Sequence, residues 1–579
     1  MFILPVMKKT GFIILFIYLL PLSLIVFAAV KLFYYNYDGF VSYVASSLHK
    51  PGWEKFIRSQ FTENAFNISK WIIVFLAGCY LFAGFYLFRK KTSLIRKLDA
   101  GIISFSNKMK ELKKEFSQMP AYSKWLLVVL FLFVIVKALW YIINWPLQYD
   151  EVWTYNYNIG NGFWQSFLLP QNHTFFTVVA WFFHLLPIDP QISMRLPNFF
   201  AGLVLLIIFF IFIKRYVSLK AALVSTFFLS TCCPVVFYML YARGYLFVLL
   251  FTIIALWLQL ILIREKQSNF YKLLLFTAIV LGYWSNPVFL YPHAAIASSV
   301  FIYCFSKKTL KIFWQNILVH TIAILAMVIL YLPTLLSSHI DELIQTGVRD
   351  TFEPDMLWLS FIYNSWFIFG IRSGYVLLSL FLIFIAVELI QKNRFGFLHW
   401  FLISSFFIIL IFSFLQSLPL AGHITIFLSI SMAVLLAFVF KGIEMKIGIN
   451  KIVFLLLLAG TIAFNTYMAH HHYWFNWSVE YDRSTKKVAA EMISKKIRNC
   501  YLSVNYYKPH LEYYYKIKGK ELHIGMADTS SQDHHPFNPG LHESVILRNN
   551  KTSNLDLHQY QIFYQDETIT AYIRTDVNR

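Results

Sequence analysis

Residues 125–153 read WLLVVLFLFVIVKALWYIINWPLQYDEVW, and this stretch indicates both the class of the protein and the location of its site. The apolar run over 125–143 is long enough to cross a bilayer, which takes about 20 residues. Asp150 and Glu151 follow soon after it, and no lysine or arginine occurs between residues 138 and 194. A carboxylate pair without a nearby cation is costly at the mouth of a membrane helix. We therefore interpret Asp150 and Glu151 as functional residues.

The composition indicates a polytopic membrane protein and excludes a soluble globule. Of the 579 residues, 58% are hydrophobic and 14% are charged, and the mean hydropathy is +0.58. Apolar runs recur along most of the chain and predict about 13 spans. The first has no small-residue cleavage site, so it is interpreted as a retained helix rather than a signal peptide. The predicted spans lie near 12–33, 71–88, 125–143, 196–213, 221–240, 244–263, 272–287, 288–305, 313–333, 374–390, 398–416, 420–440 and 452–468.

The net charge of +21 follows the predicted topology and does not indicate a nucleic-acid partner. Lysines and arginines concentrate in every second connection between spans, which the positive-inside rule makes cytoplasmic. The N-terminus is then cytoplasmic, whereas the acidic pair, the 334–373 loop and the C-terminal region face outside. The lysine-rich linker over 89–124 is interpreted as a surface helix that contacts anionic membrane lipids.

The chain divides into three predicted parts. Residues 1–124 hold two N-terminal spans and the basic linker, 125–469 the main transmembrane module, and 470–579 a polar outer domain. The outer domain combines a helical segment near 488–497 with a strand near 500–507, which predicts a small α/β fold. Its single cysteine, Cys500, gives no disulfide framework.

The first large outer loop also contains the apolar, aromatic stretch Thr174–Leu186. It is short for a span, and if it crossed, the later basic connections would lie on the wrong side of the membrane. We therefore predict a helix lying in the plane of the outer interface.

Several short motifs occur in a characteristic order. Tyr149-Asp-Glu151 is followed by Asn172-His173, then by the interfacial stretch, then by Met194-Arg-Leu-Pro197 at the start of a span, and then by Tyr241-Ala-Arg-Gly-Tyr245. This order resembles that of the GT-C glycosyltransferases that use polyprenyl-phosphate sugars, which include the protein O-mannosyltransferases and the lipid A aminoarabinose transferases. The resemblance covers roughly residues 125–579. It implies a polytopic α-helical GT-C fold of about 13 spans, with juxtamembrane helices in the first large outer loop and a small C-terminal extracytoplasmic α/β domain.

The resemblance implies an outward-facing transferase. Nucleotide sugars do not occur outside the cytoplasm, so the donor would be a sugar carried on a polyprenyl phosphate, and a single sugar would move to an acceptor hydroxyl, with inversion. By analogy with the family, Asp150 is the expected general base, and Glu151 orients the site or binds acceptor or metal. A solvated loop acid is the alternative for Asp150.

The leaving phosphate calls for cations on the outer face. Arg195 and Arg243 match family arginines and are expected to bind it, with snorkelling to lipid headgroups as the alternative. His173 corresponds to the histidine of a family motif whose prolines are replaced here by Thr174 and Phe175. Arg372 and His423 are further candidates on the outer face, and a structural role is the alternative for His423.

Tyr241 stands where many relatives have a second acid just before Ala-Arg. A carboxylate pair for a metal is therefore less favoured. We predict no metal or other cofactor, with a divalent metal as the alternative.

Two other classes of function stay open at this stage. A lipid-linked saccharide flippase or transporter could use the acids as relays, although such proteins usually contain internal repeats, and we find none. A glycan ligase or polymerase would use longer lipid-linked saccharides. The expected partners of a transferase are the lipid-linked donor, a protein or glycolipid acceptor, and membrane lipids. The composition is typical of a low-GC bacterial genome, which predicts a multi-pass protein of the bacterial cytoplasmic membrane.

Overall fold

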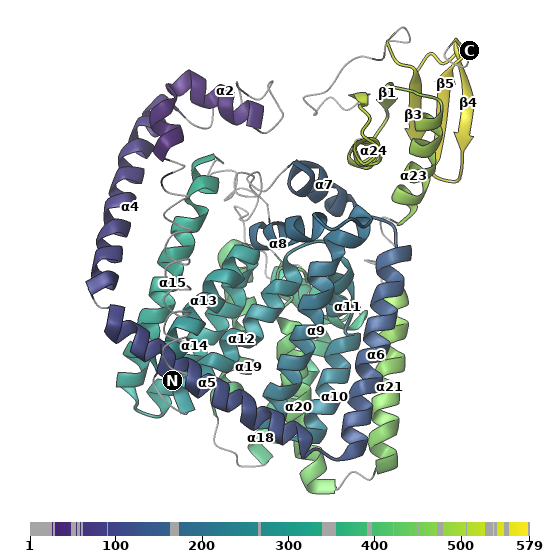
Figure 1. Ribbon diagram of the computed structural model, residues 1–579. Coiled ribbons are helices and arrows are strands. Elements are labelled where there is room, and N and C mark those ends of the chain that lie inside the picture. The colour runs from purple at the N-terminus through teal and green to yellow at the C-terminus, as the bar shows by residue number, and fades with distance from the viewer. Residues whose placement is uncertain are drawn as a thin grey trace.

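The computed structural model is a bundle of long helices with a small sheet domain at one end (Figure 1). It describes residues 29–47, 62–89, 91–161, 173–264, 268–337, 355–390, 396–417, 419–420, 422–447, 451–471, 479–504, 506–526, 541–548 and 555–576, together with Val26, Glu54, Arg58 and Phe537. Within these residues, eight helices are long and apolar enough to cross a membrane, or up to 10 if each of two bent pairs forms one span. The protein is a multi-pass membrane protein, as the sequence predicts.

The spans follow the predicted apolar runs closely. The eight helices that qualify alone lie in α4 (Glu63–Arg89), α6 (Ala121–Asn144), α9 (Pro190–Tyr216), α12 (Tyr245–Arg264), η4 with α14 (Pro287–Phe289 and Leu290–Ser306), α15 (Leu310–Ser337), α19 (Phe397–Gln416) and α20 (Leu428–Ile447). The predicted runs at 272–287 and 452–468 are also helical, in α13 (Asn269–Ser285) and α21 (Lys451–His471). Most of the predicted span at 12–33 lies outside the described residues.

Two regions differ from the prediction. The run at 221–240 is not one straight span but α10 (Leu219–Thr231) and α11 (Cys233–Leu240), bent by 55°. Pro234 explains the break, because proline lacks the N–H that a continuous helix needs and is tolerated only in the first turn. Part of the predicted 334–373 loop is the apolar helix α17 (Asp355–Phe369), which meets α18 (Gly374–Ile390) at 85°.

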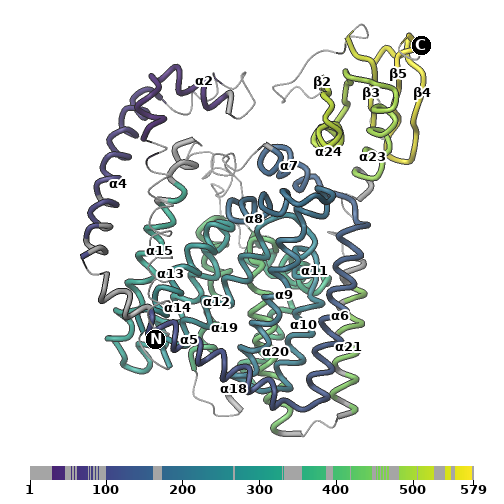
Figure 2. The backbone as a smooth tube through the Cα atoms, in the orientation of Figure 1, coloured from purple at the N-terminus to yellow at the C-terminus, as the bar shows by residue number. Residues whose placement is uncertain are grey.

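The basic connections gather at one end of the bundle. Helix α5 (Lys91–Ser117) lies obliquely across this end (Figures 1 and 2), where Lys214 at the end of α9 pairs with its Glu115 at 3.5 Å. Its Gly101 packs so closely on Phe270 at the start of α13 that a Cβ would lie 2.3 Å from the phenylalanine Cβ. Lys220 at the start of α10 pairs with Glu444 near the end of α20 at 2.7 Å. Chain segments that the sequence assigns to one side of the membrane therefore meet in space.

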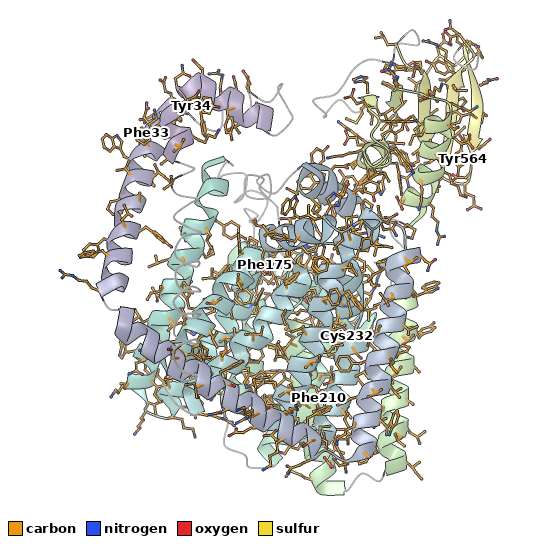
Figure 3. The ribbon with its side chains drawn as sticks, in the orientation of Figure 1. Phe33, Tyr34, Phe175, Phe210, Cys232 and Tyr564 are labelled. Carbon is orange, nitrogen blue, oxygen red and sulfur yellow. The ribbon has the colours of Figure 1, made fainter. Side chains whose placement is uncertain are left out.

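Side-chain burial agrees with a lipid-facing perimeter and a packed interior. Trp71 and Phe75 on α4 and Trp125 on α6 are about 70% exposed or more. Phe210 and Cys232, which Figure 3 labels within the bundle, are buried. Apolar side chains at a bundle surface are stable in contact with hydrocarbon, whereas they would be unfavourable in water.

The opposite end of the bundle carries two short helices and the C-terminal domain. Helices α7 (Tyr149–Tyr157) and α8 (Thr174–His184) lie across the ends of the long helices, and α8 packs on α9 (Figure 1). The helix predicted at 174–186 is therefore present as α8, and it is too short to count as a span. Helix α7, which carries the acidic pair, is a second short helix of the first large outer loop, and its bounds were not predicted.

The C-terminal domain is an α/β fold, as predicted. A mixed sheet in the order β2-β1-β3-β5-β4 packs with the helices α23 (Val479–Ser494) and α24 (Tyr507–Lys516). Strand β1 (Asn499–Leu502) is parallel to β2 (His523–Met526) and to the central strand β3 (Ser544–Arg548), and the hairpin of β4 (Tyr560–Gln565) and β5 (Ile569–Arg574) joins antiparallel to β3 through β5. The predicted strand at 500–507 is shorter than expected, because α24 begins at Tyr507.

Candidate active site

Helix α7 begins a few residues after the end of α6. The way it begins determines where the side chains of Asp150 and Glu151 point. Pro146 follows the end of α6, and Gln148 is the N-cap residue of α7 with an extended backbone. The carboxylate of Glu151 reaches back and accepts a hydrogen bond from Gln148 N at 2.9 Å, which satisfies a backbone donor at the helix start. Successive side chains on a helix point about 100° apart, so Asp150 and Glu151 face different surroundings.

Glu151 faces the interior and pairs with Arg195 of α9. Arg195 donates from Nε to Oε1 at 2.9 Å and from Nη2 to Oε2 at 2.6 Å, and both side chains are 0% exposed. The remaining guanidinium hydrogens bond the carbonyl oxygens at the end of α6, from Nη1 to Ile142 and Trp145 and from Nη2 to Pro146. A guanidinium has five N–H donors, and all five are used here.

This arrangement corrects two predictions. Arg195 was expected to bind the donor phosphate, but it has no donor left and is fully buried. Glu151 was expected in the catalytic site, to orient it or to bind acceptor or metal, but its two oxygens also accept from Ala242 N and Gln148 N and do not reach the surface. Both residues therefore hold the site together, which matches the orienting role considered for Glu151.

Asp150 faces outward toward the connection between α11 and α12. Its Oδ2 accepts a hydrogen bond from the Tyr241 hydroxyl at 2.8 Å and lies 3.3 Å from Arg243 Nη2. The Asp150 side chain is 44% exposed, and in the described part of the chain its Oδ1 accepts no hydrogen bond. Burial and the adjacent Asp150 charge raise the pKa of Tyr241 well above its usual value, so the hydroxyl stays protonated and donates.

The connection that carries Tyr241 and Arg243 is held by close contacts. Asn198, buried on α9, donates from Nδ2 to the carbonyl oxygens of both Tyr241 and Arg243, at 2.7 Å for Arg243. Gly244 approaches the backbone of α13 so closely that a Cβ would lie 2.4 Å from Ser285 O. A side chain at this position would displace the backbone.

Arg243 is a partly exposed cation beside Asp150. Burial disfavours its charge, but Asp150 and the surrounding phenols outweigh that effect and raise the pKa of Arg243 above its usual value. Its side chain is 14% exposed, and its Nε is buried without a hydrogen-bond partner among the described residues. A buried donor left unsatisfied is costly, so this atom is suited to an anion that binds beside Asp150.

Two histidines lie near this pair. His173, the residue before α8, contacts Asn286 Nδ2 through Nδ1 at 2.9 Å and packs its ring on Tyr245 at 5.0 Å. The ring of His423 also packs on Tyr245, with the ring centres 5.9 Å apart. Burial and the charge of Arg243 lower the pKa of His173 well below its usual value, and burial lowers the pKa of His423 to about 4. Both are therefore neutral near pH 7, which does not favour them as charged phosphate ligands.

Four of the seven predicted residues thus meet in one place: Asp150, Arg243, His173 and His423. Glu151 and Arg195 lie beneath them in the interior. Arg372 is separate, since it lies exposed after α17 and stacks on Trp366 with its guanidinium carbon 4.2 Å from the ring centre. Among the described residues, no three His, Cys, Asp or Glu side chains converge in a way that could hold a metal ion.

Two residues of the site were not identified from sequence. Tyr241 was noted only as a replacement for an acid, although a phenol beside a carboxylate is a hydrogen-bond donor. Asn198 lies three residues after Arg195, on the same face of α9. The spacing from Arg195 is the feature of the sequence that could have indicated Asn198.

The arrangement of helices agrees with two solved structures. ArnT from Cupriavidus metallidurans in the apo state matches with a TM-score of 0.52 at 11% identity, over 78% of this chain and 98% of that chain. The chain has the fold of ArnT. The crystal structure of ArnT bound to undecaprenyl phosphate matches over the same shares with a TM-score of 0.51 at 13% identity. The likeness to ArnT confirms the predicted polytopic helical fold with a small C-terminal domain.

The sequence itself is more distant from known proteins. No family model matches the chain, and no curated protein matches it in sequence. At 11–13% sequence identity, the likeness to ArnT concerns the arrangement of the helices and strands alone.

Proposed function

We propose that the protein is an integral-membrane glycosyltransferase that moves a single sugar from a polyprenyl-phosphate donor to an acceptor hydroxyl. The observation that carries this proposal is the pairing of the half-exposed Asp150 with Arg243, whose Nε has no partner among the described residues. A base and an adjacent anion-binding cation are the two groups that this reaction requires. The likeness to ArnT, one of whose structures holds undecaprenyl phosphate, supports the choice of donor.

Asp150 would act as the general base. Its Oδ1 takes the proton from the acceptor hydroxyl as the acceptor oxygen attacks C1 of the sugar. The bond between C1 and the phosphate oxygen breaks, and the electron pair leaves with the polyprenyl phosphate. Attack opposite the leaving group inverts the configuration at C1. The Tyr241 hydroxyl, 2.8 Å from Oδ2, holds the other carboxylate oxygen in place.

Arg243 would stabilise the leaving phosphate. Charge builds on the phosphate oxygens as the C1–O bond breaks, and a guanidinium positioned beforehand lowers the energy of that state. The ion pair with Asp150 keeps the base and the cation adjacent. Neighbouring residues then act on the acceptor hydroxyl and on the leaving phosphate.

The wider setting follows from the same proposal. Residues 125–469 form the catalytic module, 470–579 an extracytoplasmic domain, and 1–124 an N-terminal part with a cytoplasmic terminus. The site then faces outward from the bacterial cytoplasmic membrane. The acceptor is a protein or a glycolipid, and the reaction requires no metal.

Transfer of radiolabelled sugar from polyprenyl-phosphate donors to a membrane extract tests the proposal. The purified protein in nanodiscs is compared with Asp150→Asn and with Asp355→Asn, a matched control at an exposed acid that begins α17. We expect wild type and Asp355→Asn to transfer sugar and Asp150→Asn to lose transfer. Absence of transfer from any such donor, together with translocation of lipid-linked saccharide in liposomes, would instead indicate a flippase.

A further inference from the structure

The C-terminal domain packs directly on the helix that carries Asp150. Helices α24 and α7 lie side by side (Figure 1). Asn156 of α7 donates from its side-chain Nδ2 to Pro509 O at 2.7 Å. The main-chain carbonyl oxygen of Asn156 accepts from Lys516 Nζ at 3.0 Å. The Tyr157 hydroxyl donates to Glu512 at 3.2 Å. These contacts join the outer domain to the C-terminal half of α7.

A second set of contacts joins the same domain to the segment that precedes α7. Both backbone groups of Leu147 bond side chains of the C-terminal domain. Leu147 N donates to Asp482 Oδ2 of α23 at 2.8 Å, and Leu147 O accepts from His510 Nε2 of α24 at 3.3 Å. Leu147 is fully buried, so these backbone groups have no access to water and depend on the two side chains.

Asp482 and His510 are themselves buried and coupled. Asp482 is 2% exposed and accepts from the Tyr514 hydroxyl at 2.7 Å, and His510 Nε2 lies 3.6 Å from its Oδ1. Burial raises the pKa of Asp482, while His510, Tyr514 and Leu147 N oppose that effect. Buried carboxylates are rare and costly unless hydrogen-bonded, so this one stabilises a particular position of the Leu147 backbone.

The segment between α6 and α7 is therefore held from two sides. On the side of the bundle, Arg195 donates to the carbonyl oxygens of Trp145 and Pro146. On the side of the C-terminal domain, Asp482 and His510 bond Leu147. Asp150 lies three residues further on, in the first turn of α7, so its position depends on both sets of contacts.

We propose that Asp482 and His510 are positioning residues for the candidate base. They fix the Leu147 backbone, and through it the start of α7 and the carboxylate of Asp150. The C-terminal domain would thus contribute to the transferase site through the Leu147 backbone. This inference rests on the proposed function of Asp150.

The test compares variants of the full-length protein that remove each contact. Asp482→Ala and His510→Ala abolish the bonds to Leu147, and His510→Gln retains an N–H that can reach Leu147 O. Tyr515→Phe is the matched control, because this buried tyrosine on α24 bonds Ile497 O inside its own domain at 2.8 Å. Two quantities are measured: kcat and KM for the polyprenyl-phosphate donor, and hydrogen–deuterium exchange of a peptide that covers residues 145–152.

We expect Asp482→Ala and His510→Ala to lower kcat by about 10- to 100-fold, because small displacements of a reacting group are costly. KM for the donor should stay near the wild-type value, since Arg243 is untouched. Exchange in the 145–152 peptide should accelerate while that of the β1 and β3 strands does not change. His510→Gln should recover most of the activity, and Tyr515→Phe should behave as wild type.

Other outcomes would overturn the proposal. It is wrong if kcat is unchanged in both alanine variants, if only KM rises, or if Tyr515→Phe loses as much activity as they do. Exchange of the 145–152 peptide at the wild-type rate in the alanine variants would also contradict the proposal. This measurement does not depend on activity. If Asp150→Asn retains transfer, the proposed base is wrong, whereas faster exchange in the variants would still confirm the structural contact.

Discussion

The carboxylate of Glu151 and the guanidinium of Arg195 form a bidentate ion pair in which neither side chain is exposed. This pair joins α7 to α9, and Arg195 also bonds three carbonyl oxygens at the end of α6. The end of α6, the start of α7 and helix α9 therefore meet at one guanidinium. The candidate base, Asp150, immediately precedes Glu151 in the chain.

Removing one member of this pair should destabilise the fold. Breaking a buried ion pair costs about 3–5 kcal/mol, because the remaining charge is left without its partner. We expect Glu151→Gln and Arg195→Met each to lower the apparent melting temperature in detergent, whereas Asp150→Asn should not. A melting temperature equal to wild type in both variants would show that the pair is not structural.

The Tyr241 hydroxyl should contribute to turnover through Asp150. Tyr241→Phe removes one hydrogen bond to a carboxylate, worth about 1.5–3 kcal/mol, and retains the ring that packs on Phe237. We expect kcat to fall by about 10- to 150-fold, while the variant stays folded in detergent. Steady-state kinetics on the purified variant provide the check, and wild-type kcat would exclude this role.

The buried histidines should make the protein sensitive to acid without helping it to bind the donor. Burial lowers the pKa of His423 to about 4 and that of His173 well below its usual value, whereas an unfolded chain takes up a histidine proton near pH about 6.5. Stability contributed by these groups is therefore present above about pH 6.5 and is lost as the pH falls towards about 4.

Melting temperatures measured between about pH 7.5 and 5 should fall, and His423→Gln should reduce the fall. Donor affinity should not rise over the same range, because both rings stay neutral. An increase in affinity on acidification that disappears in His423→Gln would instead make His423 a phosphate ligand.

Gly244 should not tolerate a side chain. The Cβ of an alanine would lie 2.4 Å from Ser285 O and 3.0 Å from the His173 Cβ, so the connection that carries Arg243 would have to move. We expect Gly244→Ala to lose most transfer activity. Gly460→Ala is the control, because no atom outside the local backbone of its own helix and its two chain neighbours lies within 4 Å of the added Cβ there. Equal activity of both variants would contradict this role of the close contact.

Much of the fold could be predicted from the sequence, because apolar runs and basic connections are local signals. The interfacial helix at 174–186 and the outer α/β domain are of this kind. The breaks inside apolar runs were harder to predict. Pro234 bends one run, and α17 was interpreted as a loop because its apolar stretch follows a long polar segment.

The site was harder to predict, because burial is a property of tertiary structure. Asp150 and Glu151 are adjacent acidic residues that the sequence alone does not distinguish. The start of α7 directs Asp150 to the surface and Glu151 to Arg195. Arg195 and Arg243 likewise both lie at outer ends of helices. Only the partners supplied by α6 and α7 distinguish a structural arginine from one with an unused donor.

The measurement that tests the central claim most directly is the turnover of Asp150→Asn together with its affinity for the donor. Asparagine keeps the size of the side chain and can still accept from Tyr241, but it cannot take a proton from the acceptor. We predict that kcat falls by about 100- to 10,000-fold while equilibrium binding of the polyprenyl-phosphate donor is retained. Turnover at the wild-type rate in a folded Asp150→Asn protein would contradict the assignment of Asp150 as the base.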